Sequence, residues 1–143
     1  MRYIIALDQS TQGTKGLLLD EKGMPVCRVS RPHEQIVLPN GYVEHNPEEI
    51  YDNVIGVVRD LLEKSHVGTQ ELVGVGISNQ RETALAWDRQ TGKSFGNAVV
   101  WQCGRGEAIC QRIAEAGHEA AVQKKTGLRL SPYFSAARIA WVL

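Results

Sequence analysis

Residues 8–15 hold the side chains of this chain that are best suited to chemistry. Asp8 follows an apolar run at 3–7, and a short polar stretch with Gly13 and Lys15 leads into a second apolar run. Carboxylate oxygens bind Mg²⁺, often through water, and the backbone N–H groups of a small polar turn bind anions. The stretch therefore predicts a site for a metal ion and for phosphate oxygens, with Asp8 facing the metal.

The residues after this stretch indicate which type of phosphate loop it forms. A Walker A loop or a dinucleotide-binding loop leads into a helix. Here residues 17–20 predict a strand and 21–24 predict a turn, so we expect the phosphate loop at a β-hairpin. Residues 25–30 alternate apolar and polar side chains, as a half-buried third strand does. The beginning of the chain is therefore predicted to be a three-stranded meander.

A helix and a further strand follow the meander. Asn46 and Pro47 form a typical helix start, and apolar side chains at helical spacing predict a helix from about Pro47 to Lys64. Residues 72–77 predict a buried strand that carries 79–82 at its carboxyl end. The rest of the chain predicts strands at 83–87 and 98–101, and helices at 105–116, at 119–125 and from 132 onward.

The composition is that of an ordinary globular domain. The chain has 143 residues, of which 43% are hydrophobic and 22% are charged. Sixteen basic and sixteen acidic side chains cancel, which argues against a nucleic-acid surface. No apolar run approaches the about 20 residues of a membrane helix, and the N-terminus lacks a signal-peptide pattern. We expect one domain and a cytoplasmic protein without a membrane partner.

The cysteines and two of the tryptophans are expected to be structural. The cysteines are three in number and lack C-x-x-C spacing, so neither a disulfide framework nor a structural zinc site is predicted. Cys103 and Cys110 are expected to be small buried side chains. Trp87 and Trp141 stand outside any motif, and we expect them to pack in the core.

Five short motifs stand in an order that resembles the FGGY carbohydrate kinases, and among these the N-terminal part of the glycerol kinases. They are residues 8–11 (DQST), 41–47 (GYVEHNP), 76–83 (GISNQRET), 97–103 (NAVVWQC) and 126–135 (TGLRLSPYFS). The resemblance implies an α/β, ribonuclease-H-like half-domain, as in sugar kinases, actin and Hsp70 chaperones, with a mixed sheet and flanking helices. Residues 1–143 would form the N-terminal FGGY carbohydrate kinase domain, truncated before its end.

The same resemblance implies an activity and its cofactors. These transferases of carbohydrate metabolism use ATP and Mg²⁺ to phosphorylate a polyol or sugar hydroxyl, and glycerol to glycerol phosphate is the first candidate reaction. The general-base aspartate of the family corresponds to a position beyond Leu143, so we expect no catalytic residue within 1–143. Phosphoryl transfer depends on positioning and charge stabilisation, so the chain alone should turn over very little. A homo-oligomer of the full-length protein is left open.

In the phosphate loop, the resemblance places Asp8 near Mg²⁺, through water, and Thr11, Gln12 and Lys15 around the phosphates of ATP. A lysine brings a compact positive charge to phosphate oxygens. Glycerol kinases usually carry glycine, threonine and arginine where this chain has Ser10, Gln12 and Lys15. This departure resembles the pentulose kinases. The alternative substrate is therefore a pentulose of the xylulose type, or another ketose or polyol.

For the substrate, the resemblance assigns Arg81, Glu82, Trp101 and Tyr133. A guanidinium donates to hydroxyls and a carboxylate accepts from them, while aromatic rings cover the C–H groups of a polyol. Surface charges and core aromatics are the ordinary alternatives for these residues. A different class of function is a non-catalytic nucleotide-binding module like actin or Hsp70, which would share the hairpin but not this polyol set.

Overall fold

The computed structural model describes residues 1–143 and divides them into two compact units. Unit 1 comprises residues 1–34 and 48–80, and unit 2 comprises residues 35–47 and 81–143. Each unit has a sheet of its own, with four strands in unit 1 and three in unit 2. The fold class is the predicted α/β arrangement of a mixed sheet with flanking helices.

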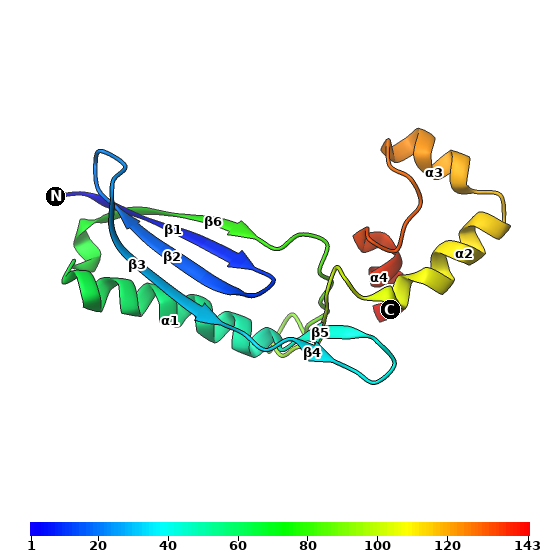
Figure 1. The fold of residues 1–143 in the computed structure, drawn as a ribbon, viewed down its shortest axis with the longest axis horizontal. Coiled ribbons are helices and arrows are strands. Elements are labelled where there is room, and N and C mark those ends of the chain that lie inside the picture. Colours follow the sequence, from blue (N-terminus) through cyan, green and yellow to red (C-terminus); the bar gives the residue numbers. More distant parts are fainter. The chain divides into compact units, whose positions relative to one another are not determined.

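Unit 1 is built on a mixed sheet in the strand order β3-β2-β1-β6 (Figure 1). The first three strands pair antiparallel, and β6 pairs parallel to β1. The strands are β1 (Tyr3–Ser10), β2 (Gly13–Leu19), β3 (Pro25–Pro32) and β6 (Leu72–Asn79). The predicted meander is confirmed, and its strands extend further than the apolar pattern indicated.

β6 confirms the predicted strand at 72–77, but the prediction that it is buried is wrong. Every residue after Leu72 in this strand is exposed, including Val75 and Ile77. Of this strand, only Leu72 packs against the core cluster that α1 shares with the sheet. An apolar sequence predicts a strand from its spacing, whereas burial depends on what packs against it.

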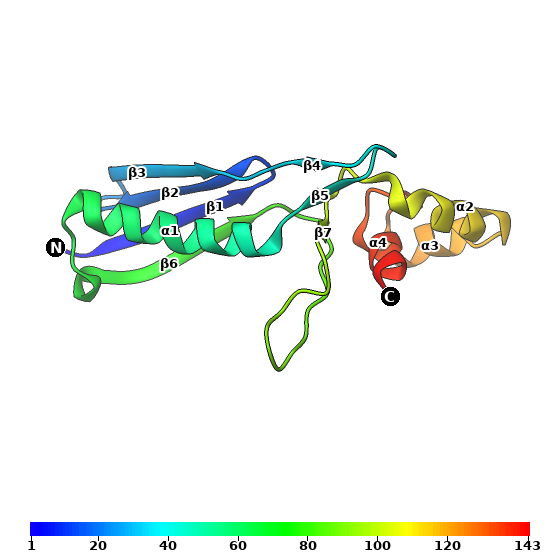
Figure 2. The ribbon, with the colours of Figure 1, turned by 90° about the horizontal axis from the view of Figure 1, so that it is seen from below.

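The helix α1 (Pro47–Ser65) lies along one face of this sheet (Figure 2). It confirms the predicted helix at 47–64. Leu7 and Leu18 point to α1 and pack in one core cluster with Val57 and Leu61 of the helix. Burial of each such side chain contributes about 1.5–3 kcal/mol, so this layer holds the hairpin strands to α1.

Gly16 lets α1 approach β2 closely. A Cβ atom at this position would clash with Val57 Cγ1 and would lie 2.8 Å from Leu61 Cδ1. Both of these atoms belong to fully buried core side chains, which have no free space to move into. The packing of helix on sheet therefore requires the missing side chain of Gly16.

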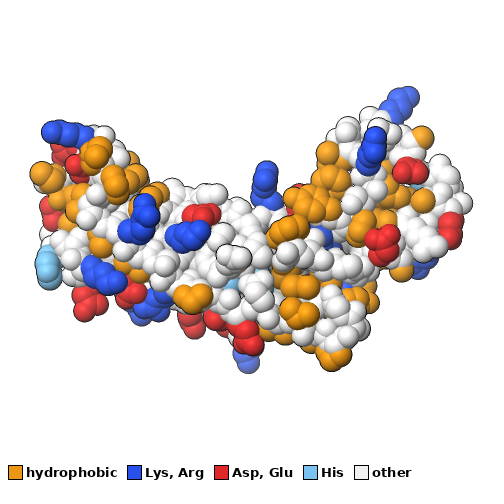
Figure 3. Space-filling model, in the orientation of Figure 1, with side chains coloured by type: hydrophobic (Ala, Val, Ile, Leu, Met, Phe, Trp, Pro, Cys, Tyr) orange, Lys and Arg blue, Asp and Glu red, His pale blue; other side chains and the backbone are white.

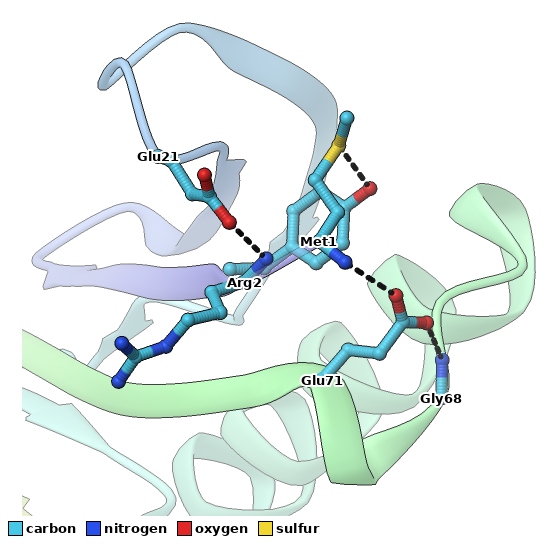
Figure 4. Close-up of polar contacts among 6 residues, drawn as sticks. Met1, Arg2, Glu21, Gly68 and Glu71 are labelled. Atoms are coloured by element: carbon cyan, nitrogen blue, oxygen red, sulfur yellow. Dashed lines mark hydrogen bonds and ion pairs between the residues drawn. The ribbon is translucent and has the colours of Figure 1, made fainter.

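Polar contacts in unit 1 join the N-terminus to the β2–β3 turn and to the residues just before β6 (Figure 4). The Met1 amino group lies 3.7 Å from Glu71 Oε1, and Gly68 N donates to Glu71 Oε2 at 3.2 Å. Arg2 N donates to Glu21 Oε1 at 2.9 Å. Because β1 and β6 run parallel, the Glu71 contacts hold the beginnings of both strands together.

Unit 2 carries a small sheet in the order β4-β5-β7. Its strands are β4 (Ile36–Val37), β5 (Val43–His45) and β7 (Ala98–Val99). The strand expected at 98–101 is thus shorter than predicted. The segment 83–87 forms only isolated bridges, Ala84 to Val99 and Trp87 to Ser94, and is not a strand of the sheet. Each residue there has too few paired neighbours to build a continuous ladder.

Three helices complete unit 2, after the 3₁₀ turn η2 (Gly104–Gly106). They are α2 (Glu107–Glu115), α3 (Glu119–Thr126) and α4 (Ser135–Val142). Gly117 and Gly127 follow α2 and α3 with φ of 75° and 74°, the left-handed conformation that commonly ends a helix. The predicted helices are confirmed, although the last begins at Ser135. None of the helices is both long and apolar enough to cross a membrane.

The prediction that Trp87 and Trp141 pack in the core is wrong, whereas the prediction that Cys103 and Cys110 are buried is confirmed. Trp87 is 59% exposed and Trp141 is 46% exposed, so neither packs in the core. The Trp141 ring instead lies over the guanidinium of Arg105, with 4.5 Å between its centroid and Cζ. Apolar side chains also reach the surface over β4 and β5 (Figure 3). Cys103 and Cys110 are free and buried.

We predict that Gly16→Ala destabilises unit 1 by about 1–3 kcal/mol, because the added methyl group overpacks the contact with α1. Urea unfolding of the purified chain measures the change. Gly74→Ala is the matched control, since Gly74 also lies in a strand of this sheet and a Cβ there meets nothing within 4 Å. Equal unfolding midpoints for the two variants would contradict the prediction.

Candidate functional site

The polar stretch 8–15 forms the end of the β1–β2 hairpin. β1 continues through Ser10 and β2 begins at Gly13, so the turn itself consists of Thr11 and Gln12. The predicted hairpin is confirmed. Asp8 lies inside β1 rather than at its end, because the polar residues after it continue the backbone pairing to the turn.

Asp8 and Lys15 share one face of the sheet. They are register partners across the hairpin, and Asp8 also pairs with Ser78 on β6. Since side chains alternate along a strand, this face is opposite to the one on which Gly16 contacts α1. A hollow of about 430 Å³ opens on it, lined by Ala6, Leu7, Asp8, Lys15, Gly16, Leu17, Arg28 and Ser78. One carboxylate and two cationic side chains thus border a single hollow.

The hairpin turn is held in shape by β3 and the residue after it. His33 N donates to the Gln12 carbonyl at 3.3 Å, and His33 Nε2 lies 3.0 Å from the Ser10 carbonyl oxygen. Gly13 permits the close approach of β3, because a Cβ there would lie 2.5 Å from the Arg31 carbonyl oxygen. His33 is buried and was not singled out from the sequence. A turn fixed in this way presents its groups to a ligand with little ordering cost.

The single carboxylate in this hollow, Asp8, is the kind of ligand that Mg²⁺ takes when it is held jointly with phosphates. Nowhere in the chain do three or more His, Cys, Asp or Glu side chains gather to hold a metal ion. Mg²⁺ usually keeps several waters and takes one or two carboxylates together with substrate phosphates. Asp8, with the Ser78 hydroxyl beside it in register, provides this kind of oxygen donor set.

The chain turns sharply after β6, at the predicted polyol pair. Arg81 is exposed, and Glu82 has a φ of 67°, which is rare for a residue other than glycine. Because Glu82 leaves the extended conformation, the two side chains are not forced to opposite faces of a strand. Glu82 Oε2 accepts hydrogen bonds from Ser135 N at 2.7 Å and Ser135 Oγ at 2.6 Å. The carboxylate thus satisfies a free N–H of the first turn of α4.

These contacts lower the pKa of Glu82. The side-chain and backbone hydrogen bonds from Ser135 are the main cause, and the positive charges of Arg138 and Arg81 act in the same direction. Burial raises this pKa but is outweighed. Glu82 is therefore an ionised hydrogen-bond acceptor at neutral pH.

Trp101 and Tyr133 form an aromatic pair in unit 2. Their ring centroids are 5.8 Å apart with an interplanar angle of 71°, and Tyr133 makes a second edge contact with Phe134 at 5.2 Å. Tyr133 is 43% exposed, and Trp101 is partly buried. The rings are thus packed on one side and accessible on another.

Arg138 joins the three segments that carry these residues. Its Nη1 donates to the Glu82 carbonyl at 3.0 Å and to the Tyr133 carbonyl at 2.6 Å, and its Nη2 donates to the Trp101 carbonyl. The side chain is fully buried, and this burial lowers the pKa of Arg138. The structure therefore brings Glu82, Trp101 and Tyr133 together around one guanidinium.

Sequence reasoning missed both Arg138 and Ser135. A signal for Arg138 was available, because it is the single charged residue in the apolar stretch 136–143. An arginine in such a stretch is almost never fully buried unless it has partners. No signal in the sequence indicates that those partners are backbone carbonyls.

A second buried arginine, Arg105, makes a separate set of contacts in unit 2. Arg105 forms an ion pair with Glu44 of β5, and its Cζ lies 4.5 Å from the ring centroids of both Tyr42 and Trp141. Burial alone would raise the pKa of Glu44, but hydrogen bonds from Asn97 and Arg105 and the charge of Arg105 lower it. This cluster connects β5 to α4 and to the segment before β7.

Comparison with known proteins shows the family. Residues 3–143 match the N-terminal domain of the FGGY family of carbohydrate kinases. The chain belongs to this family. It is 46% identical over 141 residues to glycerol kinase 1 of Thermotoga maritima, an alignment that covers 99% of this chain and 29% of that protein.

Two solved structures, of a glycerol kinase and a xylulose kinase, resemble the fold. Plasmodium falciparum glycerol kinase with ADP superposes with a TM-score of 0.89 at 37% identity, over 99% of this chain and 28% of that one. Ligand-bound xylulose kinase from Lactobacillus acidophilus gives 0.89 at 25% identity, with the same coverage. The FGGY resemblance and the predicted fold class are confirmed. The chain spans less than a third of the length of these relatives.

We predict that Ser135→Ala raises the pKa of the Glu82 carboxyl toward its ordinary value of 4.5, because one of its hydrogen bonds is lost. A lowered folded pKa gives stability that is present above the ordinary value and lost as the pH falls through the lowered one. The variant should therefore lose less stability on acidification than the parent. An NMR titration of the side-chain carboxyl measures the pKa.

Ser131→Ala is the control for this titration. Ser131 Oγ accepts a hydrogen bond from Tyr133 N and does not bond to Glu82. The pKa of Glu82 should be unchanged in this variant. A Glu82 titration in Ser135→Ala that overlays the parent curve would show that Ser135 does not control the carboxylate.

Proposed function

We propose that the chain is the substrate- and phosphate-binding N-terminal part of an ATP-dependent kinase that phosphorylates a polyol or sugar hydroxyl, with glycerol as the first candidate. The observation that carries this proposal is the ionised Glu82 fixed beside the Trp101–Tyr133 pair. A non-catalytic nucleotide-binding module like actin would need no such set of polyol-binding residues. The similarity to the Thermotoga and Plasmodium glycerol kinases supports the same substrate.

On the polyol side, each residue has a separate part. Glu82 Oε2 is engaged by Ser135, so Oε1 would accept from a substrate hydroxyl while Arg81 donates to a neighbouring oxygen. Trp101 would cover the C–H groups, and the Tyr133 hydroxyl would reach a further oxygen. The aromatic faces exclude water around the hydrogen-bonding groups, which strengthens their interactions with the ligand.

On the phosphate side, Asp8 would hold Mg²⁺ through water, and Thr11, Gln12 and Lys15 would surround the phosphates. Mg²⁺ supplies neutralisation of the phosphate charge when it is bound. Lys15 adds a positive charge on the same face as Asp8. The turn braced by His33 keeps the hairpin N–H groups in place. The Plasmodium relative with ADP supports a nucleotide as the phosphate ligand.

The general base lies outside residues 1–143 in this proposal. These residues belong to the N-terminal domain of an FGGY kinase, and the remaining length of the relatives would supply the base and the adenine site. A ketose of the xylulose type is the second candidate substrate. It is favoured by Ser10, Gln12 and Lys15 in the hairpin and by the fold similarity to the Lactobacillus xylulose kinase.

We predict that Arg81→Ala in the full-length protein raises the KM for glycerol about tenfold or more, because the substrate loses a charge-assisted hydrogen bond. Steady-state phosphorylation with ATP measures it, and a parallel panel of polyols and ketoses identifies the preferred substrate. Arg89→Ala is the matched control, since Arg89 is also an exposed arginine of unit 2. An unchanged KM in Arg81→Ala for the preferred substrate would refute the polyol site.

We predict that Lys15→Ala raises the KM for ATP about tenfold while the KM for the polyol changes less than twofold, because a phosphate contact is lost. Lys22→Ala, at the exposed turn between β2 and β3, is the control. The same assay with ATP as the varied substrate measures the effect. ATP kinetics of Lys15→Ala that match those of the control would show that the hairpin does not bind the phosphates.

A further inference from the structure

We infer that Arg138 is the positioning residue of the polyol site: its buried guanidinium fixes the backbone of Glu82, Trp101 and Tyr133 and thereby sets the geometry in which their side chains meet the substrate. The inference rests on the proposed function and adds to it a residue that does not touch the ligand. It makes α4 the element on which substrate affinity depends.

The hydrogen bonds of Arg138 go to three of the four residues proposed to bind the polyol. Two of its donors reach the Glu82 and Tyr133 carbonyls at 3.0 Å and 2.6 Å, and a third bond goes to the Trp101 carbonyl. The Arg138 side chain has no exposed surface, so it is a fixed part of the interior. Three segments distant in the sequence therefore take their relative positions from one side chain.

The hydrogen bond from Arg138 to the Glu82 carbonyl also fixes the backbone from which the Glu82 side chain projects. Glu82 has a φ of 67°, a conformation that is strained for a residue other than glycine and persists only where the surroundings hold it. The bond from Arg138 to the Glu82 carbonyl is one such constraint. Without it, the Glu82 backbone is free to return to the extended region, and its carboxylate would move away from the aromatic pair.

α4 holds Glu82 at two points. Ser135 binds the Glu82 carboxylate and Arg138, three residues later, binds the Glu82 carbonyl. Residues three apart lie on the same face of a helix, so both contacts come from one side of α4. α4 thus fixes both the backbone of Glu82 and the position of its carboxylate.

The chemistry of this position favours arginine over other residues. A guanidinium presents five N–H donors in a rigid planar fork, which suits three carbonyls in different directions. Lysine carries the charge on a single nitrogen and would reach them less completely. Methionine would fill the space but leave the three partly buried carbonyls without this donor, which displaces the segments that carry them.

The test uses Arg138→Met and Arg138→Lys in the full-length protein, with Arg129→Met as the control. Arg129 is an exposed arginine of the same unit. We expect Arg138→Met to raise the polyol KM at least tenfold and Arg138→Lys to raise it about threefold, with the ATP KM within twofold of the parent in both. A merely structural role would reduce the active fraction, and hence the apparent kcat, without changing the polyol KM of the folded enzyme.

The outcomes separate this inference from the proposed function. A parent enzyme that phosphorylates no polyol or sugar would overturn both. A parent that is active, with a polyol KM unchanged in folded Arg138→Met, would overturn the role of Arg138 alone. If Arg138→Met does not fold, as judged by circular dichroism, the same criterion applies to Arg138→Lys, which keeps the charge.

Discussion

The need to satisfy a buried guanidinium organises unit 2. A charged group removed from water is costly unless it is paired or hydrogen-bonded, and Arg138 is fully buried. The acceptors for its Nη1 and Nη2 groups are backbone carbonyls at Glu82, Trp101 and Tyr133. Because the carbonyls belong to three separate segments, satisfying one charge fixes the positions of all three. Three of the four residues proposed to bind a polyol are the same ones.

Close packing has the corresponding role in unit 1. Gly16 lets α1 rest against the sheet, and Gly13 lets β3 approach the hairpin. His33 then contacts the backbone carbonyls of Ser10, before the turn, and of Gln12, within it. Residues outside the β1–β2 hairpin thus fix its shape, and Asp8 and Lys15 lie together on the face of the sheet opposite to α1.

Much of the fold could be predicted from the sequence, because regular spacing indicates regular elements. The hairpin, the meander and α1 all follow from such local patterns, and the order of the five motifs indicates the FGGY family. Burial was less predictable. Trp87, Trp141 and most of β6 are exposed, since an apolar side chain is buried only where another element covers it.

The sequence alone determined which residue types are present, that the hairpin, the meander and α1 form, and to which family the chain belongs. These are local properties, set by spacing, turn residues and motif order. Only the tertiary structure decided that Glu82 takes a left-handed conformation, that Ser135 lowers its pKa, and that Arg138 connects it to the aromatic pair. Such contacts join residues far apart in the chain, and their geometry exists only once the folded backbone brings donors and acceptors within reach.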